Sequence, residues 1–418
     1  MNASSQPLSA SVANSPAIAR ARWATRAQFV VLGIVSGAWG AHVPSVKQHY
    51  QLNEVWLSVT LLAFAVGVLF SLFFVGRVVA RLSARKSALL GGLSLCAALT
   101  GLLLMPSFVF VLPVAFLFGA SASMFDVSIN AEGTEIEHVG KCQIMGNLHG
   151  MYSAGGMAGA ALAATMLNAG IAPLYQLLGI GLSMAVVVVF AASGMLETHS
   201  TDDEPKQDFA WPRGLLLVLG FLILAGMIAE GVMYDWSVLY LKQEIGMPQA
   251  QAALGYAAFS AAMAIARFST DALRRRFDER RLLFVGGCVA AVSMAAVLIT
   301  RNAPLAFIGF ALVGAGLALV APVLFSAATR VPGVSRAAAI ASVTSIGYAG
   351  FMIGPPLIGG LAHASSLSVA LIVVVVSAAF LAYGSRFVPQ PRAESLAPDS
   401  GTGNTTAQAA FAEKQEPK

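Results

Sequence analysis

The stretch GRVVARLSARK, residues 76–86, is followed far along the chain by the similar stretch ARFSTDALRRRFDERR, residues 266–281. Both are basic, and each follows the second long apolar run in its half of the sequence. The longest internal polar stretch, ETHSTDDEPKQDFAWPR (197–213), separates the two halves. From this weak repeat we expect two related halves of six helices each, because repeated halves are a common way of building polytopic membrane bundles.

Twelve apolar runs fill the chain, and nearly all Lys and Arg residues lie in the tails or in every second gap between runs. About 20 apolar residues suffice for a helix to cross a bilayer core about 30 Å thick, so the runs predict twelve transmembrane helices. In this arrangement only Lys47, Lys242 and Arg301 fall on the side of the membrane opposite the other basic residues. Because cytoplasmic loops carry the excess of Lys and Arg, the pattern predicts that both termini are cytoplasmic.

The composition favours the same class of protein. The chain is 57% hydrophobic and 11% charged, whereas soluble domains contain about 25% charged residues. Its net charge of +5 fits basic loops that face anionic lipid, and no basic patch is interleaved with aromatic residues as in nucleic-acid-binding proteins. We therefore expect an all-α, multi-pass protein of the plasma (inner) membrane that contacts lipid and binds no nucleic acid.

The expected organisation is two helical bundles and three polar segments. The N-terminal six-helix bundle spans 27–196 and the C-terminal one spans 214–386. Disordered cytoplasmic tails are expected at 1–26 and 387–418, with a cytoplasmic central loop at 197–213. The expected helices are 27–46, 55–76, 87–105, 108–130, 143–166, 172–195, 214–241, 250–271, 281–300, 304–327, 337–362 and 366–386. Three acids after the fourth helix are then expected in a cytoplasmic loop: Glu132, Glu135 and Glu137.

The two basic stretches carry a family resemblance. The chain resembles the major facilitator superfamily, whose corresponding loop runs roughly Gly-x-x-x-Asp-Arg-x-Gly-Arg-Arg. The matching residues in this chain are Gly76, Arg81, Arg85, Lys86, Asp271 and Arg276. The resemblance implies two pseudo-symmetric six-helix bundles and a cytoplasmic gate formed by the loop Asp and Arg residues. Because Ala80 stands where the first copy should have Asp, the gate is expected to depend on Asp271. The alternative is that these arginines serve only topology and lipid contact.

A second resemblance is more specific. The stretches MFDVSINAEGTEIE (124–137) and MGNLHGMYSAGGMAG (145–159) resemble the fucose-permease-like branch of the superfamily and its uncharacterised inner-membrane relatives. In that branch an acid and an Asn, four residues apart on helix 4, lie in the cavity, which implies this role for Asp126 and Asn130. The branch's fucose permease also has an acid on helix 1, where this chain has Gly40.

Charged residues inside apolar runs are the best site candidates, because a charge at the membrane centre costs about 2.5–3.5 kcal/mol on insertion scales. Asp126 and Glu230 are the two clear cases. The i, i+4 spacing places Asp126 and Asn130 on one face of their helix. A carboxyl whose surroundings alternate between wet and dry can take and release a proton, as proton coupling requires. The alternative for Asp126 is a structural partner for a basic group or for the backbone.

The seventh helix reads GMIAEGVMYDWSVLYL (226–241). Glu230, Tyr234 and Ser237 fall on one side of it by 3–4 spacing, and an acid with aromatic neighbours suits a sugar or another polar organic ligand. For Trp236 and Tyr240 near the outer boundary, an interfacial aromatic belt is the favoured interpretation. Trp39 and His42 on the first helix could line the outer cavity, but the belt is again the favoured interpretation.

Helices 5 and 11 carry further candidates. His149 could relay protons or bond Asn130 or Asp126, with a buried structural histidine as the alternative. Gly155 and Gly159, like Gly350 and Gly354, have the spacing that lets helices approach closely. Tyr348 is a candidate solute contact on helix 11, and Pro355 and Pro356 are expected to break or bend that helix.

No nucleotide-binding loop, metal-ligand cluster or nucleophile elbow occurs in the sequence, so we expect no enzyme, cofactor or bound metal. The resemblance implies a secondary transporter that moves a small organic solute by alternating access, as a monomer. Proton-coupled uptake of a sugar or related metabolite is the leading expectation. Efflux of a drug or metabolite by proton antiport, or a non-transporting membrane sensor, are the alternatives.

Overall fold

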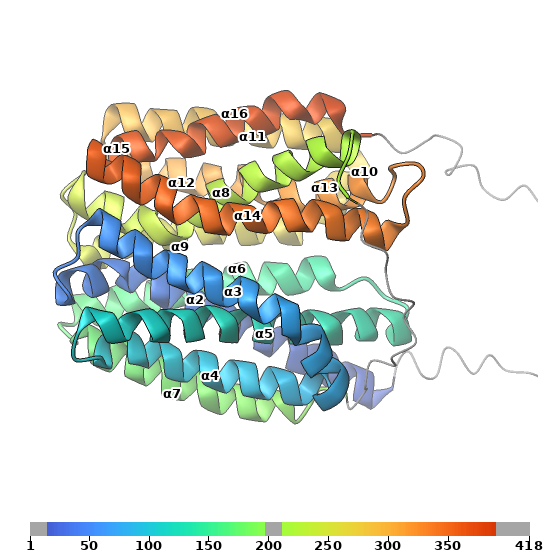
Figure 1. The fold of residues 1–418 in the computed structure, drawn as a ribbon, viewed down its shortest axis with the longest axis horizontal. Helices are drawn as coiled ribbons and strands as arrows, with labels where there is room; N and C mark the ends of the chain where they lie inside the picture. Colours follow the sequence, from blue (N-terminus) through green and yellow to red (C-terminus); the bar gives the residue numbers. More distant parts are fainter. Residues whose placement is uncertain (1–14, 197–210, 390–418) are drawn as a thin grey trace, which may run out of the picture.

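A computed structural model describes residues 15–196 and 211–389, and within these ranges the chain is helical almost throughout (Figure 1). The N-half contains α2 (Pro16–His49), α3 (Glu54–Leu82), α4 (Ala84–Leu104), α5 (Phe108–Gly140), α6 (Met145–Asn168) and α7 (Pro173–Ala192). The C-half contains α8 (Leu215–Gln243), α9 (Gln249–Phe268), α10 (Thr270–Arg276), α11 (Glu279–Thr300), α12 (Ala303–Leu317), α13 (Val320–Ala328), α14 (Arg336–Ala364), α15 (Leu367–Ala370), α16 (Ile372–Gly384) and the short 3₁₀ helix η1 (Ser385–Phe387).

Within the described ranges, ten helices are long and apolar enough to span a membrane, or eleven when the bent pair α9 and α10 counts as one span. A further long helix, α6, is not among these ten and lies between α2 and α9 in the middle of the bundle. Because its neighbours shield it from lipid, α6 can carry His149, Tyr152 and Ser153 without exposing them to hydrocarbon. The all-α fold with two related helical halves is thus confirmed.

The helices run roughly parallel to one another, so the bundle has two ends. We call the end that holds the starts of α2 and α14 together with α10 and η1 the tail end, on the right of Figure 1, and the opposite end the distal end. The α2–α3 connection and α15 lie at the distal end. Most of the basic segments named above therefore gather at one end, whereas Lys47, Lys242 and Arg301 belong to the other.

Two boundaries differ clearly from the sequence-based expectation. Helix α2 begins at Pro16 with Ser15 as its N-cap, so residues 16–26, expected as part of a disordered tail, are helical; a capping Ser followed by Pro is a strong start signal. Helix α5 continues to Gly140, so Glu132, Glu135 and Glu137 lie in a helix rather than a loop. Residues 1–14, 197–210 and 390–418 of the expected polar segments lie outside the described residues.

The long α5 is explained by what its acids bind. Glu132 is fully buried and accepts a hydrogen bond from the backbone N–H of Leu196 at 2.6 Å. Glu137 accepts hydrogen bonds from the N–H groups of Ile144 and Met145 at 2.6 and 2.9 Å. These N–H groups at the start of α6 have no partner within their own helix, so the acid supplies it. Glu137 thus fixes the turn between α5 and α6, and Glu132 ties α5 to the segment that follows α7.

The halves are packed in the same way internally. In the N-half α2 packs on α6, α3 on α5, and α4 on α5 and α7; in the C-half α8 packs on α14, α9 on α12, and α11 on α12 and α16. Between the halves, α6 meets α9 and α3 meets α14, while α2 contacts both α8 and α9. These contacts form the seam between the halves, where the charged residues of the bundle interior lie.

Glycine contacts confirm the close-packing prediction at three of its four positions. A Cβ on Gly350 would come within 3.2 Å of the Leu224 carbonyl oxygen of α8. A Cβ on Gly155 or Gly159 would overlap the carbonyl oxygens of Val30 or Ile34 in α2, and a Cβ on Gly37 would overlap the carbonyl oxygen of Gly156. Helices α2 and α6 therefore touch backbone to backbone, as small residues allow. The prediction is wrong for Gly354, because a Cβ there would meet nothing within 4 Å.

Helix α14 also continues through Pro355 and Pro356, so the expected break is absent. The sharp change of direction lies elsewhere. Helices α9 and α10 meet at an angle of 57° around Ser269. The helix expected at 304–327 is interrupted at Ala318 and Leu319, which separate α12 from α13.

The interpretation of four aromatic and polar residues as an interfacial belt is wrong. Trp236 and Tyr240 are 1% and 0% exposed, and Trp39 and His42 are 6% and 0% exposed. His42 is hydrogen-bonded through its ring nitrogens to Ser45 and Gln176, both at 3.1 Å. These residues are core residues because α8 and α2 line the seam between the halves rather than the lipid.

Candidate functional site

A buried ion pair stands at the centre of the seam. Arg267 near the end of α9 donates from Nη2 to Glu230 Oε1 of α8 at 2.9 Å, and the two side chains are 12% and 18% exposed. Arg267 also donates from Nη1 to Ser153 Oγ of α6 at 2.8 Å. Arg267 therefore joins an acid of its own half to a hydroxyl of the other half. Glu230, predicted as a site residue, is placed at this junction.

Tyr234 completes the surroundings of Glu230. Its hydroxyl donates to Glu230 Oε1 at 2.9 Å, one helical turn away on α8. Its ring lies 5.4 to 6.5 Å, centroid to centroid, from the rings of Tyr152, Tyr256 and Phe259. The predicted pairing of Glu230 and Tyr234 on one side of the helix is thus confirmed, within an aromatic cluster that spans α6, α8 and α9.

The second acid lies in the N-half. Asn130 Nδ2 donates to Asp126 Oδ1 at 3.0 Å and to the Asp126 carbonyl oxygen at 2.9 Å, which confirms that both lie on one face of α5. Asp126 is close enough to interact electrostatically with Tyr348 of α14, in the other half. Tyr152 lies within electrostatic reach of Glu230, Arg267 and Asp126. The two acids therefore belong to one polar region on both sides of the seam.

His149 joins this region but not in the expected way. It lies one turn before Ser153 on α6, close enough to interact electrostatically with Arg267, and its ring packs edge-on against Phe29 at 5.6 Å. In the described part of the chain it forms no hydrogen bond with Asn130 or Asp126. Its side chain is exposed although it lies inside the bundle, so solvent reaches the neighbourhood of the ion pair.

Ser237 was predicted to join the same site, but in the structure it lies away from Glu230 and Arg267. It is fully buried, and its hydroxyl has no hydrogen-bond partner among the described residues. Two turns along α8 from Glu230, it faces the packed core at the distal side. The 3–4 spacing placed it on the correct face of the helix, but depth along the helix separates it from the polar region.

Arg267 is the site residue that the sequence analysis missed. It was counted with the basic stretch 266–281, because five other arginines follow within fifteen residues. The available signal was its position two residues before Ser269, inside the apolar run that ends there. Arg267 still belongs to the helical span, whereas the later arginines follow the bend.

At the tail end, the four residues predicted to form a gate are placed separately. Arg81, Asp271 and Arg276 are exposed, whereas Arg85 is half-buried and interacts electrostatically with Glu132. The described residues include no ion-pair partner for Asp271.

The charge hub at this end is Glu279, at the start of α11. Its side chain is 8% exposed and binds Arg274 at 2.5 Å and also Arg330. Arg274 and Arg330 both donate to Ser326 Oγ, at 2.9 and 2.8 Å. The hub therefore ties α10, α11 and the end of α13 together within the C-half.

The distal end is closed by hydrogen bonds across the seam. Gln249 Nε2 at the start of α9 donates to the Ala41 carbonyl oxygen at 2.9 Å and to Ser45 Oγ at 2.7 Å, both in α2. Lys242 of α8 donates to Gln48 Oε1 at 3.3 Å. These hydrogen bonds lie between the distal end and the polar region in the middle of the bundle. The side chain of His149 in that region is nevertheless exposed to solvent.

Comparisons with known proteins agree with this architecture. The family model of the Major Facilitator Superfamily matches residues 24–341 and 219–415. An uncharacterised MFS-type transporter of Yersinia pestis is 33% identical over 346 residues, which cover 83% of this chain and 90% of that protein. The membrane protein MosC of Rhizobium meliloti is 29% identical over 370 residues, covering 87% of this chain and 89% of that protein.

Two solved structures share the fold at low sequence identity. A D-xylose-proton symporter has a TM-score of 0.71 and 13% identity, with 89% of this chain and 98% of that chain covered. An inward-facing bacterial homologue of the human lysosomal transporter Spinster has a TM-score of 0.67 and 15% identity, with 90% and 98% covered. The chain therefore belongs to the major facilitator superfamily, as an integral multi-pass membrane protein of a transporter family rather than an enzyme.

Proposed function

We propose that this protein is a proton-coupled secondary transporter of a small organic solute, which works by alternating access with Glu230 as the proton-carrying acid. The observation that carries the proposal is the pair of contacts that Arg267 makes with Glu230 in one half and with Ser153 in the other. An acid in such a position controls a contact between the two halves through its own charge. Protonation of Glu230 removes the charge that holds Arg267, and so changes the balance between conformations.

The cost of buried charge supports this role. A membrane protein retains ionisable groups in its interior mostly where they pair with each other or serve transport. Glu230 and Arg267 are paired and partly reached by solvent, with side-chain exposures of 18% and 12%. A proton can therefore reach the Glu230 carboxyl, and its binding weakens the electrostatic attraction to Arg267 at hydrogen-bond distance.

The second acid supplies the solute contact in this proposal. Asp126 of α5, which is hydrogen-bonded to Asn130, is within electrostatic reach of Tyr348 of α14 across the seam, so a solute between the halves would contact Asp126 and Tyr348. Rocking of the halves about such a site exposes it to each side in turn. Hydrogen bonds close the distal end in this conformation, while solvent reaches His149.

The orientation in the membrane is part of the proposal. The basic segments at the tail end support a cytoplasmic location for that end and for both termini, in the inner membrane. Under this orientation the distal end faces outward, and solvent reaches the polar region from the cytoplasm.

Proteoliposomes that contain the pH dye pyranine test the function. A panel of sugars, carboxylates and amines is added outside, and internal pH is followed together with solute uptake. We expect at least one solute to enter with protons, and Glu230→Gln to abolish the pH change. Glu135→Gln, an acid on α5 away from the site, is the matched control and should behave as wild type.

The outcomes separate the parts of the proposal. Solute uptake without any pH change contradicts proton coupling. A pH change that persists in Glu230→Gln contradicts the assignment of the acid. If no solute in the panel enters, the transport function itself is contradicted.

A further inference from the structure

The hydrogen-bond donors and acceptors of the polar region indicate which class of solute could bind there. We propose that the transported solute is an organic anion whose negative group binds Arg267 in place of the Glu230 carboxylate once Glu230 carries a proton. The inference rests on the proposed function above and deepens it. It is argued from two places on the seam, the central ion pair and a pocket at the distal end.

In the central region, the Arg267 guanidinium has N–H groups beyond the two that bind Glu230 and Ser153 among the described residues. Glu230 Oε1 accepts from both Arg267 and Tyr234, and Asp126 Oδ1 accepts from Asn130. A guanidinium has five N–H groups in a planar fork that matches a carboxylate. Among the described residues, the hydrogen bonds of Arg267 run from Nη1 and Nη2. The group that best fits these remaining donors is a carboxylate or a similar oxyanion.

The charge balance favours the same class. In the present arrangement the Glu230 carboxylate neutralises Arg267. A proton on Glu230 leaves the guanidinium without its counter-charge inside the bundle, which is costly because a buried charge needs a partner. A solute with one negative charge restores neutrality, whereas a neutral or cationic solute does not. Proton and anion therefore bind together and travel in the same direction, one proton per negative charge at Arg267.

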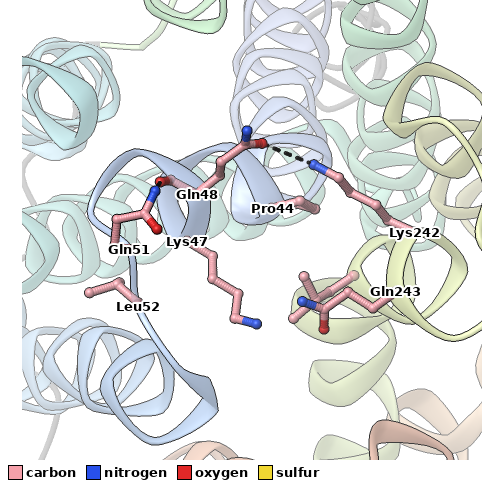
Figure 2. Close-up of a pocket in the computed structure, with 8 residues that line it drawn as sticks. Pro44, Lys47, Gln48, Gln51, Leu52, Lys242 and Gln243 are labelled. Carbon is pink, nitrogen blue, oxygen red and sulfur yellow. Dashed lines mark hydrogen bonds between the residues drawn. The ribbon is translucent and has the colours of Figure 1, made fainter.

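The pocket at the distal end is an independent observation. It has a volume of about 280 Å³ and lies between α2 and α8 on the seam; its lining is Pro44, Lys47, Gln48, Gln51, Leu52, Leu239, Lys242 and Gln243. Figure 2 shows Lys47 reaching from α2 into the space that faces α8, and Lys242 reaching from α8 toward Gln48. Two ammonium groups thus enter one small pocket from opposite halves.

Only one of these two charges is neutralised. Lys47 Nζ pairs with Glu54 Oε1 at 2.7 Å. Lys242 Nζ instead donates to two neutral amide oxygens, of Gln48 at 3.3 Å and of Gln249 at 3.0 Å. Among the described residues the pocket therefore carries an excess of one positive charge, and a negative group of a solute can supply the missing counter-charge.

The position of these lysines strengthens the argument. They are two of the three basic residues that the charge pattern places on the side opposite the basic loops, where Lys and Arg are normally scarce. They are also near enough to interact with each other, and like charges repel. Two unfavourable placements at one point on the seam are explained if the pocket attracts anions to the distal end of the seam.

The test compares solutes that differ mainly in charge, in the pyranine proteoliposome assay. The probes are gluconate with glucose, lactate with glycerol, and glucosamine as a cation. We expect the anion of a pair to enter with protons and its neutral partner not to do so. Arg267→Gln should abolish anion-driven proton entry, and Arg267→Lys should restore part of it, because it keeps the charge without the planar fork.

The distal pocket has its own variant and control. Replacing both Lys47 and Lys242 by Gln should raise the KM for the anion about tenfold at low salt, with kcat little changed. Arg301→Gln removes the third basic residue of that side away from the pocket, and it should leave KM unchanged. An equal rise in KM for both variants, or no rise in the double variant, overturns the role of the pocket.

The two proposals fail differently. If glucose, glycerol or glucosamine drives proton entry and the anions do not, the anion inference is overturned while proton-coupled transport stands. If none of the probes drives proton entry and no solute of the wider panel is taken up, the proposed function falls and the anion inference falls with it.

Discussion

Arg267 of α9 donates a hydrogen bond from Nη1 to Ser153 Oγ of α6 at 2.8 Å, and this bond crosses the seam between the two halves. The same guanidinium holds Glu230 of α8 at 2.9 Å through Nη2. One planar group thus connects an ionisable acid to the opposite half. Any change in the charge of the acid is transmitted to the inter-half contact through this single side chain.

The first prediction concerns this ion pair. Arg267→Gln leaves Glu230 without its counter-charge, and loss of one partner of a buried pair costs about 3–5 kcal/mol. Since solvent reaches both side chains, we expect a cost near the lower end of that range. The double variant Glu230→Gln with Arg267→Gln should be more stable than Arg267→Gln alone, because no lone charge remains. Thermal unfolding of the purified variants in one detergent measures the difference, and a double variant as unstable as the sum of the singles contradicts it.

The second prediction concerns backbone contact between α2 and α6. Gly37→Ala places a methyl group against the Gly156 carbonyl oxygen, and overpacking of this kind costs typically 1–3 kcal/mol. Gly354→Ala is the control, because its Cβ meets nothing within 4 Å and alanine favours a helix. We expect a lower unfolding temperature only for Gly37→Ala. Equal unfolding temperatures for the two variants would show that the helices separate at no cost.

The third prediction compares the two acids at the tail end. Glu279→Gln leaves Arg274 and Arg330 without their shared carboxylate. We expect this change to lower the free energy of unfolding by about 1–3 kcal/mol. Asp271→Asn changes an exposed side chain, so its effect on stability should stay within about 0.5 kcal/mol. Chemical unfolding followed by tryptophan fluorescence compares the two variants.

Asp271→Asn also tests the gate implied by the family resemblance. If Asp271 pairs with loop arginines in another conformation, solute uptake should slow in this variant although stability is unchanged. Uptake at the wild-type rate would leave the basic stretch with a role in topology alone.

The fourth prediction concerns the closed distal end. Gln249→Ala removes two hydrogen bonds to α2, each worth about 1 kcal/mol, and should shift the population about tenfold or more toward opening at this end. A cysteine at Ala253, which is fully buried on α9, reports the change when Cys96, Cys142 and Cys288 are replaced by Ser. Labelling by a membrane-impermeant maleimide should rise. Gln251→Ala, exposed on the same helix, is the control, and equal labelling in both variants would argue against the latch.

The sequence predicted correctly which residues share a helix face. It did not predict how deeply each of them is buried in the bundle. Asp126 with Asn130, and Glu230 with Tyr234, follow from spacing alone because an i, i+4 pair is adjacent on any α-helix. Ser237 shares the face of Glu230 and yet is sealed in the core. Depth depends on which helix of the other half packs there, and spacing within one helix carries no information about that.

The aromatic residues show the same limit. Trp236 and Tyr240 near a helix end look like an interfacial belt, a pattern that holds for helices facing lipid. Helix α8 contacts α2, α9, α14 and α16, so both side chains are buried. Likewise, the sequence predicts α6 as a span, and only its place between α2 and α9 explains how it tolerates polar residues.

By itself the sequence determined the all-helical membrane fold, the repeat of two halves and the separation of basic from apolar segments, because insertion into a bilayer depends on local hydrophobicity and charge. Only the tertiary structure decided that Arg267 belongs to the seam rather than to the basic loop, and that Lys47 and Lys242 enter one pocket. Those pairings join residues of different helices, up to about two hundred positions apart in the chain, and they arise from packing between the halves. The partner of a buried charge is therefore set by the contact surface of the folded bundle.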